Sequence, residues 1–156
     1  MENEVNSYLL IKEAYNLPDV KPSEVAPLIL AHIGDAVYET VIRTVELSKG
    51  NRAIAKVHSD SIKLVNAKTQ AALADKILPI LSPEEEAEYK RGRNAKSATH
   101  AKNASISDYR KATGVEALIG YLYLLAKWMG MRYTALGQSI KGNVVWHLIF
   151  ILKIIQ

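Results

Sequence analysis

The chain of 156 residues contains no cysteine. Disulfide bonds and thiolate metal sites are therefore excluded, and we expect a protein of the reducing cytoplasm. The acidic N-terminus, residues 1–4, lacks the basic start and apolar core of a signal peptide, which favours the same location. The sequence also shows no strand-like alternation, no internal repeat and no glycine-rich phosphate loop. We therefore expect an all-α protein that needs no small-molecule cofactor.

One long apolar run occurs near the C-terminus, from Val144 to Ile155, and only His147 and Lys153 interrupt it. As a helix this run would be about 18 Å long, whereas the hydrocarbon core of a bilayer is about 30 Å thick. We therefore expect that this run does not span a membrane and is instead a packing helix, at a subunit contact for example. Residues 142–156 are assigned to no known element.

The size of the chain predicts a single domain, residues 1–156, with a substantial core. Its hydrophobic fraction of 49% and charged fraction of 23% are those of a globular protein. The net charge of +4 is unevenly distributed, because the stretch from Lys90 to Lys111 alone carries +6. This stretch is either a phosphate-binding surface or a solvated loop, and its residues 90–97 read as a loop in which Gly92 provides freedom to adapt.

Helical periodicity dominates the rest of the sequence. Ser82 and Pro83 mark one clear helix start, with a capping hydroxyl followed by proline in the first turn. The predicted helices are residues 5–17, 28–47, a long and kinked stretch over 52–78, a helix from 83 into the basic loop, 107–130 and 131–141.

Two acidic segments lie inside runs that otherwise predict buried helix. They are centred on Asp35, which follows Gly34, and on Glu116, which lies four residues before Gly120. A carboxylate on an apolar helix is costly unless it is paired or binds a metal ion. If the two helices pack together, Asp35 and Glu116 converge and suit magnesium, which prefers oxygen ligands. The alternative is that each acid forms a salt bridge with a neighbouring lysine or arginine.

Several other polar residues allow two interpretations. Glu39 either supports Asp35 from one helical turn away or pairs with Arg43, and spacing does not choose between these roles. His32 is either a metal ligand or a half-buried, hydrogen-bonded histidine, and the second is predicted because magnesium disfavours imidazole. His58 and Lys68 are either phosphate contacts or ordinary surface groups.

The amino-acid sequence of the two acidic segments is a more specific signal than the spacing of their acids. Ile-Gly-Asp-Ala-Val-Tyr-Glu at 33–39 and Glu-Ala-Leu-Ile-Gly-Tyr-Leu-Tyr-Leu at 116–124 resemble the two signature blocks of ribonuclease III catalytic domains. Because no double-stranded-RNA-binding domain is present, the chain is most similar to the compact bacterial subgroup, Mini-ribonuclease III. His58 and the stretches 65–71 and 91–97 match the same subgroup. The resemblance covers residues 27–137.

This resemblance implies a ribonuclease III-like helical bundle that acts as a homodimer. It implies hydrolysis of double-stranded RNA with Mg²⁺ or Mn²⁺, leaving 5′-phosphate and 3′-hydroxyl ends, and maturation of large-subunit (23S) ribosomal RNA precursors. Asp35 and Glu116 would be the catalytic, metal-binding carboxylates. Two positions depart from the four-acid pattern of full-size ribonuclease III, since Ala31 and Thr113 stand where acids are usual. Water or RNA phosphate oxygens would then complete the metal's coordination.

Without a separate RNA-binding domain, the catalytic domain must hold the duplex itself, mainly through backbone contacts. Asn94 and Ser97 are placed to reach base edges, and the remaining candidates are placed to contact phosphates. The full predicted set is His58, Lys68, Arg91, Arg93, Asn94, Lys96, Ser97 and Lys102. The alternatives are a catalytically idle relative that only binds structured RNA, and a helical scaffold with no RNA role.

Overall fold

The computed structural model describes residues 7–97 and 103–125, and in these ranges it contains helices and no strand. The all-α prediction is confirmed. The elements, in chain order, are α1 (Ser7–Ala14), η1 (Pro22–Glu24), α2 (Pro27–Ser48), α3 (Ile54–Val65), α4 (Ala67–Ile77), η2 (Leu78–Ile80), α5 (Pro83–Arg93) and α6 (Ile106–Leu124). Lys102, the helix predicted at 131–141 and the apolar tail lie outside the described residues.

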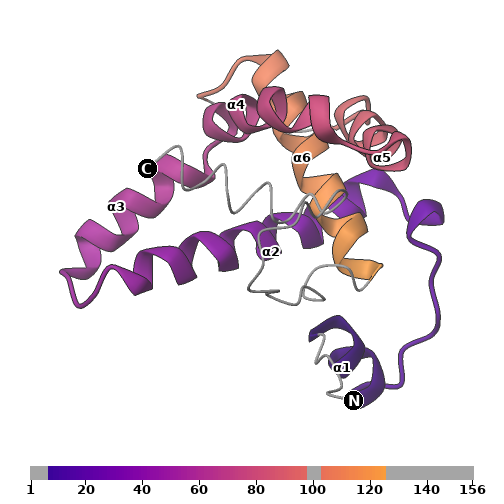
Figure 1. Ribbon diagram of the computed structural model, residues 1–156, viewed down its shortest axis with the longest axis horizontal. Helices are drawn as coiled ribbons and strands as arrows, with labels where there is room; N and C mark the ends of the chain where they lie inside the picture. Colours follow the sequence, from indigo (N-terminus) through magenta and orange to yellow (C-terminus); the bar gives the residue numbers. More distant parts are fainter. Residues whose placement is uncertain (1–6, 98–102, 126–156) are drawn as a thin grey trace, which may run out of the picture.

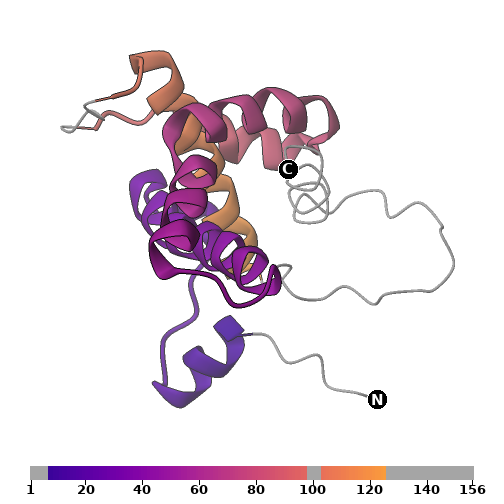
Figure 2. The ribbon, with the colours of Figure 1, turned by 90° about the vertical axis from the view of Figure 1, so that its left-hand side faces the viewer.

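Helix α6 is the centre of the bundle and packs against α2, α4 and α5 (Figure 1). Its apolar side chains, such as Leu118 and Leu122, are buried together with Ile42 of α2 and Leu73 of α4. Helices α2 and α6 cross in Figure 1, and the side view looks nearly along α2, with α6 running behind it (Figure 2). None of the helices in the described ranges is both long and apolar enough to span a bilayer.

The stretch predicted as one kinked helix over 52–78 is two helices, α3 and α4. Asn66 divides them, because its backbone is extended (ψ 157°) and its side chain accepts a hydrogen bond from the amide of Thr69. Asparagine is a favoured N-cap, so the residue that ends α3 also begins α4. The start predicted at Ser82 is confirmed, with a complete capping box between Ser82 and Glu85.

The basic segment is more helical than its composition suggests, since α5 continues through Arg93. The predicted loop over 90–97 is therefore wrong for its first four residues. Gly92 is buried against α6, where a Cβ atom would lie 2.4 Å from the Cβ of Ala117. Gly92 thus permits close packing of α5 on α6 and provides no loop freedom.

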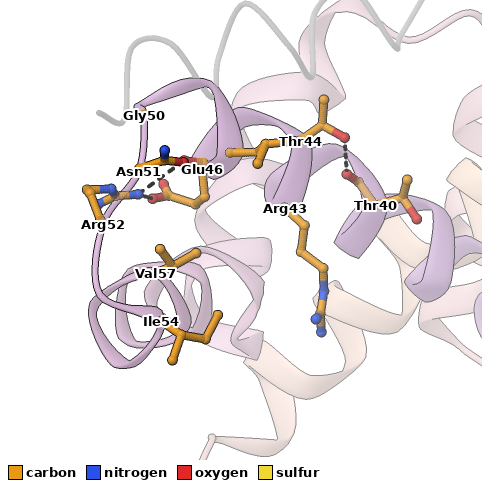
Figure 3. Close-up of a pocket in the computed structure, with 10 residues that line it drawn as sticks. Thr40, Arg43, Thr44, Glu46, Gly50, Asn51, Arg52, Ile54 and Val57 are labelled. Carbon is orange, nitrogen blue, oxygen red and sulfur yellow. Dashed lines mark hydrogen bonds and ion pairs between the residues drawn. The ribbon is translucent and has the colours of Figure 1, made fainter.

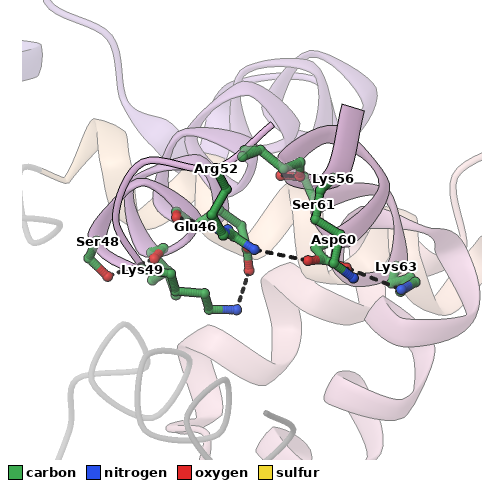
Figure 4. A network of polar contacts seen from close by, with 10 residues as sticks. Glu46, Ser48, Lys49, Arg52, Lys56, Asp60, Ser61 and Lys63 are labelled. Atoms are coloured by element: carbon green, nitrogen blue, oxygen red, sulfur yellow. Dashed lines mark hydrogen bonds and ion pairs between the residues drawn. The ribbon is translucent and has the colours of Figure 1, made fainter. Parts of the chain in front are cut away.

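Helices α2 and α3 form an antiparallel hairpin that a polar network closes (Figure 4). The fully buried Glu46 accepts hydrogen bonds from Lys49 at 2.6 Å and Arg52 at 2.7 Å, and these hold its pKa below the usual range. Arg52 also donates to Asp60. Lys63 and Lys56 lower the pKa of Asp60 to about 2. The network fixes the turn between the two helices.

A cavity of about 510 Å³ lies at the end of this hairpin and is lined by Arg43, Glu46, Arg52 and their neighbours (Figure 3). A second, more apolar groove of about 630 Å³ lies between α1, α2 and α6. Neither is lined by Asp35 or Glu116.

Candidate active site

Asp35 and Glu116 lie where α2 and α6 cross, and two glycines make the crossing possible. A Cβ atom at Gly34 would lie 1.8 Å from the carbonyl oxygen of Glu116. Reciprocally, a Cβ atom at Gly120 would lie 2.0 Å from the carbonyl oxygen of Leu30. The helices therefore meet backbone to backbone, and only glycine allows so close an approach. This contact brings the two acidic segments together, as the sequence predicts for packed helices.

The two carboxylates are half-buried, and burial raises the pKa of both. Burial, and then the negative charge of Asp35, raises the pKa of Glu116 to about 7, although a hydrogen bond from Gln70 opposes the change. Burial also raises the pKa of Asp35, and the charge of Glu39 raises it further. A bound cation would favour the ionised form of both carboxylates and so oppose these changes.

The donor set fits a divalent cation that keeps much of its hydration. In the described ranges no three acidic or histidine residues gather into a ready metal cluster. Asp35 and Glu116 supply the oxygen donors that Mg²⁺ prefers, and Mg²⁺ commonly binds through one or two carboxylates and several waters. A buried oxygen of Gln70, next to Glu116, also has no hydrogen-bond partner among the described residues, as expected of a group that faces such a water.

The two positions that hold acids in the four-acid pattern belong to the core here. Ala31 packs with Leu30 and Ala117. The Thr113 side chain is buried, and its hydroxyl donates to the carbonyl oxygen of Tyr109 at 3.0 Å. The site thus has two carboxylates at the crossing.

Glu39 pairs with Arg43 on the same helix, and its negative charge raises the pKa of Asp35. A supporting role of Glu39 toward Asp35 stays a prediction. His32 is exposed, so the prediction that it is half-buried is wrong. Its charge opposes the rise in the pKa of Asp35.

Two neighbours of Glu116 were not predicted to have a role. Gln70 on α4 donates from Nε2 to Glu116 Oε1 at 3.0 Å. Tyr38 is buried on α2, and its hydroxyl donates to the carbonyl oxygen of Leu64 at 2.9 Å. Burial and the charge of Glu116 raise the pKa of Tyr38. The sequence signal for both residues is their position in the stretches 33–39 and 65–71, which resemble the family.

The predicted RNA contacts are spread over three elements. His58 is exposed on α3, and Lys68 is exposed in the first turn of α4, two residues before Gln70. Asn94 and Lys96 are exposed just after α5. The remaining two are less exposed, since Arg93 Nε donates to Asn94 Oδ1 and the Ser97 hydroxyl lies 3.3 Å from that of Tyr109.

Arg91 does not belong to this group. Its guanidinium donates to the carbonyl oxygen of Val25 at 2.6 Å, to that of Pro22, and to Glu88. These contacts hold the turn that leads into α2 against α5. These hydrogen bonds use four of the five guanidinium N–H groups of Arg91 and disfavour an RNA contact, and its predicted role in RNA binding stays a prediction.

Arg110 was missed as a candidate. It lines a cleft of about 400 Å³ between the end of α5 and the start of α6, together with Arg93, Asn94 and Lys111. Lys111 is paired with Asp75, whereas Arg110 is exposed. Arg110 lies six residues before Glu116 on the same helix, about 9 Å along the axis. The basic cleft and the carboxylate pair therefore share one helix.

Comparison with known proteins adds a family to this geometry. The Ribonuclease III domain family matches residues 28–127. The chain is 50% identical over 114 residues to Mini-ribonuclease 3 of Clostridium tetani, covering 72% of this chain and 74% of that protein. It is 42% identical over 127 residues to Mini-ribonuclease 3 of Thermoanaerobacter sp., covering 81% and 84%. A crystal structure of a protein from Fusobacterium nucleatum superposes with a TM-score of 0.65 at 34% identity, covering 69% of this chain and 88% of that one.

Proposed function

The chain belongs to the ribonuclease III family, and we propose that it is a divalent-metal-dependent endoribonuclease that cleaves double-stranded RNA. The observation that carries this proposal is the convergence of Asp35 and Glu116 at the crossing of α2 and α6. Burial disfavours the ionised form of both carboxyl groups, and a cation bound between them would offset this cost. Mg²⁺ is the preferred ion, and Mn²⁺ offers the same chemistry to the same donors.

Each part of the site has a task in phosphodiester hydrolysis. The bound ion would lower the pKa of a water molecule and neutralise charge that develops on the phosphate. Asp35 and Glu116 hold the ion, and Gln70 fixes one oxygen of Glu116. The products are a 5′-phosphate and a 3′-hydroxyl, because water attacks phosphorus and the 3′ oxygen leaves.

The proposed RNA surface combines the basic cleft with exposed groups on neighbouring helices. Arg93, Lys96 and Arg110 contact phosphates beside α6. His58, Lys68, Asn94 and Ser97 extend the surface, and Lys102 is part of the same proposal. A-form RNA is recognised mainly through its backbone, which suits such a surface.

We extend the proposal to the assembly and the substrate. A homodimer with two-fold symmetry would match the two strands of a duplex, and two-fold dimers are the commonest oligomers. The relatives named Mini-ribonuclease 3 favour a ribonuclease role. Precursors of large-subunit (23S) ribosomal RNA, processed in the cytoplasm, are the proposed substrate. The alternative of a catalytically idle RNA-binding relative is disfavoured by the intact carboxylate pair.

Cleavage of a double-stranded RNA in Mg²⁺ and in chelator tests the activity. We expect cleavage only with Mg²⁺, and at least about 10²-fold slower cleavage by Asp35→Asn and Glu116→Gln, which lose a metal ligand and charge stabilisation together. Retained duplex binding in both variants distinguishes lost chemistry from lost folding. Turnover close to wild type in either variant at saturating Mg²⁺ would exclude this assignment.

The salt dependence of duplex affinity, measured in Ca²⁺ to suppress cleavage, tests the RNA surface. Replacing Arg93, Lys96 and Arg110 by alanine should flatten the slope by slightly under one unit for each lost phosphate contact. Lys21→Ala, at an exposed position outside the basic cleft, is the matched control. An unchanged slope in the triple variant would place the RNA elsewhere.

A further inference from the structure

Gln70 is a buried polar side chain whose hydrogen bonds point to a role at the metal site. Its residue is 2% exposed, on the α4 face that packs against α6. Nε2 donates one hydrogen bond to the carbonyl oxygen of Val65 at 3.1 Å and another to Glu116 Oε1 at 3.0 Å. Both partners are acceptors, so they fix which end of the amide faces them.

The oxygen of the same amide, Oε1, has no hydrogen-bond partner among the described residues. Gln70 Oε1 is buried and finds no hydrogen-bond donor in residues 7–97 and 103–125. An unsatisfied buried acceptor is destabilising, so a group of this kind normally has a partner, which here the described residues do not supply. The amide is hydrogen-bonded to Glu116, one of the two carboxylates that we assign to the metal.

We propose that Gln70 is a positioning residue for the metal ion: Nε2 fixes the Glu116 carboxylate, and Oε1 accepts a hydrogen bond from a water in the ion's hydration shell. This inference rests on the proposed metal-dependent function. An ion held by only two carboxylates keeps several waters, and each water has two hydrogens to donate. Gln70 thus offers an acceptor where a hydrated ion offers donors.

The same residue also links three elements. Val65 is the last residue of α3, Gln70 lies on α4 and Glu116 lies on α6. The short segment around the Asn66 cap therefore sets where the amide stands. Because α3 ends at Val65, its carbonyl oxygen is available to the Gln70 amide, which also reaches Glu116. In one continuous straight helix the amide would not make both of these hydrogen bonds.

Metal affinity, measured apart from cleavage, tests the inference. Binding of Mn²⁺ at pH 8 is followed by electron paramagnetic resonance of the free ion in wild type, Gln70→Met, Ser61→Ala and Glu116→Gln. Gln70→Met keeps the length of the side chain and removes both hydrogen-bonding functions. Partners of metal ligands typically contribute 10–100-fold to affinity, so we expect a loss of about that size. Ser61→Ala removes another buried hydrogen bond, to Val57 O, and should leave affinity unchanged.

The outcomes separate this inference from the proposed function. Weak binding by both Glu116→Gln and Gln70→Met, with Ser61→Ala unchanged, supports the inference. Affinity within twofold of wild type in Gln70→Met, together with a loss in Glu116→Gln, overturns the role of Gln70 and leaves the metal site intact. Undiminished binding in Glu116→Gln contradicts the metal site itself. If Gln70→Met does not fold, Gln70→Asn, whose amide is one methylene too short to make both bonds, decides in the same way.

Discussion

Glu116→Gln should make the metal-free protein more stable at alkaline pH while it abolishes cleavage. The variant keeps the shape of the side chain and an oxygen that accepts from Gln70. It removes a negative charge that burial and Asp35 both disfavour. The folded protein therefore holds the neutral side chain more readily than the ionised carboxylate of the wild type.

The magnitude follows from the pKa of Glu116, which is about 7 in the folded protein and 4.5 as the reference value. Because the folded pKa is the higher one, the folded state binds more protons between these values, and the stability of the wild type falls as pH rises. Each pKa unit corresponds to about 1.4 kcal/mol, so ionisation of Glu116 costs about 3 kcal/mol at pH 8 and about 1 kcal/mol at pH 5. The melting temperature of the variant at pH 8 should rise by about 10 °C.

The assay is thermal and urea unfolding followed by circular dichroism, at pH 5 and pH 8, in chelator and in Mg²⁺. In chelator the advantage of the variant should grow with pH. In Mg²⁺ it should shrink or reverse, because an ion that binds only the folded wild type stabilises it in proportion to the logarithm of its concentration. Glu13→Gln, at an exposed position on α1, is the control and should change stability by less than about 0.5 kcal/mol.

A variant that is less stable than wild type by the same amount at both pH values would refute this reasoning. It would mean that the carboxylate is solvated or already neutralised by a partner in the metal-free protein. The argument that burial and the charge of Asp35 disfavour the ionised Glu116 would then have no basis.

Three further predictions concern the fold. Gly34→Ala should destabilise the protein by about 3 kcal/mol or more in urea unfolding, because its Cβ would lie 1.8 Å from the carbonyl oxygen of Glu116. Stability should decline as pH falls from about 5 to about 2, because the folded pKa values of Glu46 and Asp60 are lowered, and Glu46→Gln should weaken this dependence in an acid titration of unfolding. Tyr89→Phe should be neutral or stabilising by thermal melting, because the buried hydroxyl finds no partner among the described residues.

The helices that form the site could be predicted from sequence because their signals are local. The ends of α2 lie within a residue of the predicted bounds, and the start of α5 at the Ser82 cap is confirmed. Apolar spacing, proline in a first turn and capping side chains act over four or five residues. Such features need no knowledge of the neighbouring helices.

The missed features depend on contacts between elements. Asn66 occurs inside an unbroken helical pattern, and only its extended backbone shows that it caps α4. Gly92 has the composition of a loop, yet packing against Ala117 keeps it helical. Arg91 has the charge of an RNA contact, but the carbonyl oxygen of Val25, 66 residues earlier in the chain, takes one of its donors. None of these partners can be identified from the local sequence.

In the site, too, some residues could be predicted from sequence and others depended on contacts between helices. That Asp35 and Glu116 would converge depended on α2 packing against α6, and the small neighbours of the two acids were the clue. Gln70 lies in the stretch 65–71 that resembles the family, but nothing local indicated that it contacts Glu116, because a single glutamine on an amphipathic helix is usually a surface group. Its burial and its unsatisfied oxygen became visible only in the packed structure.

The crossing explains why two acids and two glycines occur together in this chain. Glycine at 34 and 120 lets the backbones touch, which places two carboxylates in partly buried positions. Burial disfavours the ionised form of both, and the charge of Asp35 further disfavours that of Glu116. A fold selected for stability alone would place an apolar or neutral residue at 116, as the expected gain from Glu116→Gln indicates. The cost is therefore best explained by a ligand that needs both charges. A hydrated divalent cation has the required charge, and the buried Ala31 and Thr113 leave room in its coordination for water and for RNA phosphate.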